Sequence, residues 1–153
     1  MMKSLFIGGM EIKLPIIQGG MGVGISLSGL ASAVANEGGI GVISCAGLGL
    51  IYTGHGNFFQ NCIWGLKEEF RLARERTKGV VGVNIMVALT NFADMVRTAM
   101  EEEVDIIFSG AGLPLDLPSY LIPGSKTKLV PIVSSARAAK IICDKWHNNY
   151  NYL

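Results

Sequence analysis

Two kinds of segment alternate along the chain of 153 residues. Short apolar runs with few charges are typical of strands that are buried on both faces, and they occur at 15–18, 40–44, 80–86, 105–108 and 128–133. Segments with apolar residues at helical spacing lie between them, at 28–37, 66–77, 92–103 and from 134 to about 146. The pattern therefore predicts five successive strand–turn–helix units.

The alternation of strand and helix predicts an α/β fold with a parallel sheet and right-handed crossovers. A doubly wound sheet and a (β/α)8 TIM barrel both satisfy it. Glycine or small polar residues follow strands one, four and five, as active-site loops do at one barrel mouth, and no dinucleotide-binding GxGxxG fingerprint follows strand one. We therefore predict a single domain over residues 1–153 of the TIM-barrel type, with about five of the eight units present.

Several local features refine this picture. Residues 4–13 are expected to form a lead-in hairpin or plug, and residues 118–121 a short helical turn. Ser28 is the expected N-cap of the first helix. Residues 45–63 are expected to be irregular, and the charged run in 66–77 is interpreted as a solvated helix face. Residues 147–153 are polar without helical patterning, which predicts an irregular tail.

Composition narrows the class of protein. Thirteen basic and twelve acidic side chains leave a formal charge of +1 without a basic block, so neither nucleic acid nor a membrane surface is indicated as a partner. No apolar run is long enough to predict a signal peptide or a membrane span. Cys45, Cys62 and Cys143 are far apart and lack metal-ligand spacing, which predicts a cytoplasmic protein with no metal site.

Glycine is concentrated directly after the first predicted strand, in the run Gln18-Gly19-Gly20-Met21-Gly22-Val23-Gly24. Because glycine has no Cβ, such a turn can present backbone N–H groups to a flat or anionic cofactor. A tight connection whose glycines serve packing alone has the same local sequence. The turn by itself leaves both interpretations open.

Two further motifs lie where strands end. Asn84 interrupts an apolar strand, and a buried amide without a partner costs about 1–3 kcal/mol. It therefore either binds a ligand ring or caps a neighbouring loop. Gly110-Ala111-Gly112 follows the fourth strand and repeats the strand-then-glycine arrangement, while Ser134 and Ser135 either donate to a ligand or, as we favour, cap the fifth helix.

The segments PIIQGGMGVGISLSGLASAVANEGGIGVIS, GVVGVNIMVALTNFADMVRTAMEEEVDIIFSGAGLPLDLP and KLVPIVSSARAAKIICDKW resemble the nitronate monooxygenase family, which includes close relatives that are flavin-dependent enoyl-acyl carrier protein reductases. The resemblance implies a TIM-barrel flavoprotein that binds FMN non-covalently. It places Gly19, Gly20, Met21 and Gly22 beside the isoalloxazine ring. It also implies that Asn84 hydrogen-bonds the flavin and that Gly110, Ala111 and Gly112 approach the active site.

The function implied by the resemblance is oxidation of alkyl nitronates with O2 to a carbonyl compound and nitrite. The alternative is an NAD(P)H-dependent enoyl-thioester reductase on the same barrel, or an inactive truncated remnant. The family's catalytic histidine lies in a later AGGH-type segment that nothing in this sequence matches, and neither His55 nor His147 has a carboxylate companion, so no catalytic residue is assigned. An open five-strand sheet also predicts self-association through exposed apolar surface.

Overall fold

The computed structural model describes residues 3–152, and Met1, Met2 and Leu153 of the predicted domain lie outside the described residues. Four parallel strands form its central sheet in the order β3-β4-β5-β6. Their bounds are β3 (Gly41–Ser44), β4 (Val81–Met86), β5 (Ile106–Gly110) and β6 (Lys128–Pro131). Each strand pairs in parallel with the next strand of the sheet in chain order.

The predicted strand 15–18 joins this sheet as a parallel bridge between Ile17 and Ile40, outside the named strands. The Gln18 amide donates to the Ile40 carbonyl at 3.0 Å, and the Ile40 amide donates to the Ile16 carbonyl at 2.9 Å. The segment therefore lies beside β3 and extends the four-stranded sheet by a single bridge.

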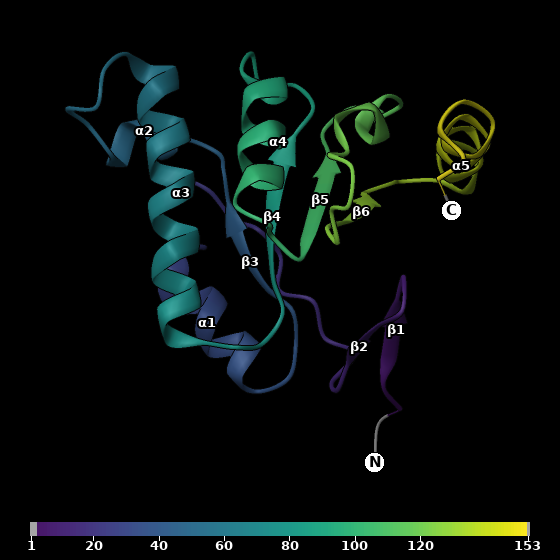
Figure 1. The fold of residues 1–153 in the computed structure, drawn as a ribbon, viewed down its shortest axis with the longest axis horizontal. Coiled ribbons are helices and arrows are strands. Elements are labelled where there is room, and N and C mark those ends of the chain that lie inside the picture. The colour runs from purple at the N-terminus through teal and green to yellow at the C-terminus, as the bar shows by residue number, and fades with distance from the viewer. Residues whose placement is uncertain (1–2, 153) are drawn as a thin grey trace.

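Helices cover one side of the sheet, with α5 beyond β6 (Figure 1). Their bounds are α1 (Ser28–Asn36), α2 (Leu48–Ile51), α3 (Phe58–Arg76), α4 (Phe92–Glu101), the 3-10 helix η1 (Leu117–Tyr120) and α5 (Ala136–Tyr150). The prediction that residues 45–63 are irregular is wrong, because this stretch contains α2 and the first turns of α3. A capping box between Asn57 and Gln60 starts α3 well before the charged run from which the helix was predicted.

Apolar side chains leave the sheet on both faces, as in a buried parallel sheet. Alternate residues such as Ile43, Val83 and Ile107 pack against the helices in the larger core. The intervening residues Val42 and Phe108 join a second cluster on the opposite face. That opposite face corresponds to the interior of a barrel.

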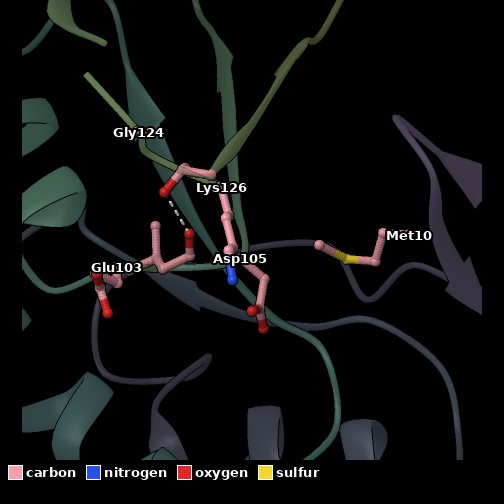
Figure 2. Close-up of a pocket in the computed structure, with 7 residues that line it drawn as sticks. Met10, Glu103, Asp105, Gly124 and Lys126 are labelled. Carbon is pink, nitrogen blue, oxygen red and sulfur yellow. Dashed lines mark hydrogen bonds between the residues drawn. The ribbon is translucent and has the colours of Figure 1, made fainter. Parts of the chain in front are cut away.

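The N-terminal hairpin closes one end of this interior face. β1 (Leu5–Ile7) and β2 (Met10–Ile12) pair antiparallel, as expected of a lead-in hairpin, and Ile12 is buried in the interior cluster. A pocket of about 290 Å³ lies at the same end, between the hairpin and the connections that precede β5 and β6. Figure 2 shows the residues that line it, among them Met10, Asp105 and Lys126. Within this lining, Thr127 Oγ1 donates to the Val104 carbonyl at 2.7 Å. This pocket lies at the end of the sheet opposite to the glycine turns.

The predicted irregular tail 147–153 is wrong over most of its length, because α5 continues to Tyr150. Asn151 then adopts the left-handed conformation and ends the helix, with its amide bonded to the His147 carbonyl and that of Tyr152 to Trp146. This turn packs the Tyr152 ring on Trp146, with 5.6 Å between centroids. The Tyr152 hydroxyl accepts a hydrogen bond of 2.9 Å from the amide of Leu129 in β6.

Within residues 3–152, every helix is too short or too polar to cross a membrane.

Candidate functional site

The glycine turn lies at the carboxyl ends of the parallel strands, and one buried serine gives it its shape. The Ser26 hydroxyl accepts from the Met21 amide at 2.9 Å and donates to the Gly19 carbonyl at 3.2 Å. The Ser26 carbonyl in turn accepts from the Ser44 amide at the end of β3 at 2.9 Å. Ser26 is only 1% exposed. It therefore closes residues 19–26 into a loop and attaches that loop to the sheet.

Gln18 continues the pairing between the segment 15–18 and β3 through its side chain. Its Oε1 accepts from the Val42 amide at 3.1 Å, and its Nε2 donates to the Val42 carbonyl at 3.0 Å. The same Nε2 lies 3.0 Å from Ser26 Oγ. The side-chain carboxamide of Gln18 thus takes the place of one residue of backbone pairing. The chain can therefore leave the sheet at Gly19 and enter the turn.

Gly20 lies directly against Asn84 of β4. A β-carbon at Gly20 would lie 2.5 Å from the Asn84 Cβ and 3.4 Å from Val42 Cγ1. Gly22 lies close to the connection after β3, since its β-carbon would lie 2.9 Å from the Ala46 Cβ. By contrast, a β-carbon at Gly19 would meet nothing within 4 Å. The turn is therefore packed on the sheet at Gly20 and Gly22 and open at Gly19.

Asn84 lies on the interior face of the sheet, at the same level as Ser44 of β3 and Phe108 of β5. The side chain is half-buried, and its amide group makes no hydrogen bond to any residue of the described chain. Within residues 3–152 the backbone amides of Gly19, Gly20 and Gly22 are likewise without a protein acceptor. Unpaired donors and an unpaired carboxamide on one wall fit the polar edge of a flavin ring.

Gly110, Ala111 and Gly112 lie at the end of the neighbouring strand β5. The Val87 amide after β4 donates to the Gly110 carbonyl at 2.8 Å, and a β-carbon at Gly110 would lie 2.8 Å from the Ile132 Cβ. Ala111 and Gly112 have positive φ values of 53° and 143° and are exposed. The three predicted motifs therefore lie at one end of the sheet, with Gly20 and Asn84 in contact and the β5 turn one strand further along.

Large apolar side chains surround this end of the sheet and remain exposed. Met21 is 62% exposed and Ile25 59% exposed beside the glycine turn. Ile132 is 50% exposed after β6. An aromatic cofactor and apolar substrate groups bury such side chains when they bind, so the surroundings of the turn suit a flat, largely apolar ligand.

Other candidate residues lie elsewhere. His55 is exposed and stacks on Trp64, with 3.7 Å between ring centroids, and His147 lies in the last turn of α5. The Ser135 hydroxyl accepts from the Ala138 amide at 3.2 Å, so the expected capping of α5 is confirmed.

Sequence reasoning missed the residues that shape the turn. Ser28 was expected to cap α1, but Leu27 is the N-cap and makes no side-chain cap bond. The Ser28 amide instead donates to Glu69 Oε2 at 2.5 Å. Glu69 is 3% exposed, which corrects the interpretation of its charged run as a wholly solvated face. No local signal marks Ser26 or Glu69, because their partners are distant in the sequence or lie in the turn itself.

Parallel strands with glycine turns at their carboxyl ends are typical of part of an α/β barrel. A sequence model described as nitronate monooxygenase matches residues 3–102, which is more than half of the chain. The chain belongs to the nitronate monooxygenase family, a family of flavin-dependent oxidoreductases. The predicted family is therefore confirmed.

Solved structures confirm the predicted barrel fold. FabK from Thermotoga maritima is 28% identical with a TM-score of 0.68, over 88% of this chain and 38% of that chain. Nitroalkane oxidase from Streptomyces ansochromogenes is 17% identical with a TM-score of 0.67, over 88% of this chain and 44% of that chain, which is evidence of the fold alone. The chain thus spans less than half the length of these proteins. No curated protein matches it.

Proposed function

We propose that this chain forms one wall of the FMN site of a nitronate monooxygenase, which oxidises alkyl nitronates with O2 to a carbonyl compound and nitrite in the cytoplasm. The observation that carries the proposal is the contact of the Gly19–Gly22 turn with Asn84, where unpaired backbone amides and an unpaired carboxamide share one surface. FMN supplies the electron-transfer chemistry when it is bound.

The residues of this wall have distinct roles in the proposal. Gly19 leaves open space over the turn, so the face of the flavin ring can lie against the backbone. The carboxamide of Asn84 hydrogen-bonds the polar edge of the ring. Gly110, Ala111 and Gly112 border the ring from the β5 side. Ser26 and Gln18 hold the turn in place and do not contact the ring.

A second candidate is an NAD(P)H-dependent enoyl-thioester reductase on the same barrel. The observation that favours it is the identity to FabK, 28%, which exceeds the 17% identity to nitroalkane oxidase. Both candidates use the same FMN wall. They differ in the substrate, so nitrite release from an alkyl nitronate and NAD(P)H oxidation with an enoyl thioester separate them.

The first test is flavin binding by the purified chain. We expect flavin absorbance that is released by heating, or uptake of added FMN measured by flavin fluorescence. All the contacts proposed here are to the ring, so riboflavin and FMN should bind with affinities within about threefold of each other. A chain that is colourless and takes up neither flavin would overturn the proposal and favour the inactive remnant.

A further inference from the structure

Glu69 connects two segments at the barrel mouth that are distant in sequence. It lies on α3 and is almost fully buried, and its Oε2 accepts from the Ser28 amide at 2.5 Å. Ser28 is the first residue of α1 and comes two positions after Ser26, which closes the glycine turn. A carboxylate is favoured at a helix N-terminus by the helix dipole and by the unpaired amides there.

The other oxygen of Glu69 binds the connection after α2. The Tyr52 hydroxyl donates to Glu69 Oε1. Both carboxylate oxygens of Glu69 therefore accept hydrogen bonds. The pKa of Tyr52 is raised, first by burial and then by its hydrogen bond to Glu69, so the phenol keeps the proton that it donates.

Tyr52 begins the loop of residues 52–57, and the loop is fastened to α3 by aromatic contacts. The Tyr52 ring lies 5.2 Å from that of Trp64, and it fills the space over Gly65, where a β-carbon would lie 2.6 Å from Tyr52 Cδ2. Further along the loop, the His55 ring stacks on Trp64, and the His55 amide donates to Asn61 Oδ1 at 3.0 Å.

The α2 segment, which precedes the loop, lies against the glycine turn. A β-carbon at Gly24 would lie 3.4 Å from Ile51 Cδ1, and one at Gly47 would lie 2.5 Å from Val23 Cγ2. The α2 segment that leads into the loop therefore already packs on the glycine turn. Glu69 is the one described side chain that hydrogen-bonds both the start of α1 and the start of the loop.

We propose that Glu69 is a positioning residue that holds the glycine turn and the loop of residues 52–57 in one fixed relation, so that the loop borders the flavin site. The flavin part of this inference rests on the proposed function, and the structural part does not. An ordinary helix cap predicts something different, because a cap orders only the start of α1 and leaves the loop independent.

Hydrogen exchange of the cofactor-free chain tests the structural part. We compare the wild type with Glu69→Ala, Glu69→Gln and Tyr52→Phe. Glu68→Gln is the control, because within residues 3–152 the half-buried Glu68 carboxylate bonds Arg71 and neither Ser28 nor Tyr52. In Glu69→Ala we expect exchange about tenfold faster in peptides covering 19–28 and in those covering 52–57, with β5 unchanged. Glu69→Gln, which keeps an acceptor for Ser28 and a donor toward Tyr52, should restore most of the protection.

Tyr52→Phe tests the same proposal if Glu69→Ala fails to fold, because it removes only the hydrogen bond between Tyr52 and Glu69. It should speed exchange in the loop and, to a smaller degree, in the turn. Faster exchange confined to 27–30 in Glu69→Ala, or a turn unaffected by Tyr52→Phe, would overturn the proposal in favour of simple capping. Uniformly faster exchange over the whole chain would overturn it in favour of general destabilisation.

FMN titration tests the flavin part separately. We expect Glu69→Ala to weaken FMN binding about tenfold and Glu69→Gln to remain within about threefold of wild type. If the wild-type chain does not bind FMN, the proposed function fails and the exchange experiment still decides the role of Glu69. If FMN affinity is unchanged in Glu69→Ala while exchange responds as expected, the loop does not border the flavin site and that part of the inference is wrong.

Discussion

A β-carbon at Gly20 would lie 2.5 Å from the Cβ of Asn84, so the glycine turn of residues 19–26 is packed directly on the asparagine of β4. Separations under 3.0 Å between such atoms are essentially never seen. Neither atom is at the end of a flexible side chain, so relief requires the turn or the strand to move. The contact thus makes Gly20 a structural requirement for the geometry of the turn.

Gly20→Ala is expected to destabilise the cofactor-free chain by about 1–3 kcal/mol, the usual cost of overpacking. Gly19→Ala is the matched comparison, because its β-carbon would meet nothing within 4 Å. It should leave the cofactor-free stability nearly unchanged and still weaken FMN binding, since the new methyl group occupies space assigned to the flavin. Denaturant unfolding and FMN titration measure the two effects. Equal stability loss in both variants would contradict this account of the turn.

Asn84→Ala is expected to lower FMN affinity about tenfold, which corresponds to one hydrogen bond of about 1.4 kcal/mol. The cofactor-free chain should lose little stability, because the Asn84 amide has no hydrogen-bond partner in the described chain. Gln18→Ala should behave differently and destabilise the cofactor-free chain by about 2 kcal/mol, because it removes the paired bonds to Val42. Unchanged FMN affinity in Asn84→Ala would exclude its contact with the flavin.

Tyr152→Phe is expected to increase self-association of the chain. The substitution removes the bond to the Leu129 amide, about 1 kcal/mol, and leaves an unpaired donor on the outer edge of β6. The ring still packs on Trp146. Light scattering at increasing protein concentration measures the effect, with Tyr150→Phe as the control, since that hydroxyl binds the exposed Asp116 and not the strand. Identical scattering by both variants would show that Tyr152 does not protect this edge.

We expect the buried Cys45 thiol to make the chain less stable at alkaline pH. Burial, followed by the nearby Cys62, raises the pKa of the Cys45 thiol above its ordinary value. A raised folded-state pKa adds stability that is complete below the unfolded pKa, about 8.5, and is lost as the pH rises above it. Cys45 should therefore make the unfolding free energy fall above about pH 8.5, contributing at most about 1.4 kcal/mol per pH unit to the slope. Cys45→Ala should flatten this slope, and a slope unchanged by Cys45→Ala would refute the assignment.

The spacing of apolar residues along the chain predicts the strands and most helices, because each of these elements buries apolar side chains at regular intervals. It places the four named strands of the sheet within a few residues and brings the glycine turns to one end. It fails for the start of α3, where the apolar residues Phe58 and Phe59 are exposed and the capping box of Asn57 and Gln60 decides the boundary. It also fails for residues 147–150, because a helix that is exposed on most sides shows no apolar stripe.

The candidate site is predictable only in part. Glycine runs at strand ends point to the turns, and an amide within an apolar strand points to Asn84. Ser26 and Glu69 cannot be found this way, because a serine or a glutamate has no distinctive local pattern. Glu69 lies in a run of charged residues whose other members are mostly solvent-exposed, and only the approach of α1 to α3 shows that it is buried.

The strand order β3-β4-β5-β6 has a consequence for synthesis of the protein. Each ladder of the sheet joins strands that are neighbours in the chain, so every pairing can form as soon as the second strand has left the ribosome. Gly20 can meet Asn84 once β4 has emerged, before β5 and β6 have left the ribosome. The contact between the glycine turn and β4 can therefore form during translation and serve as a template on which later segments fold.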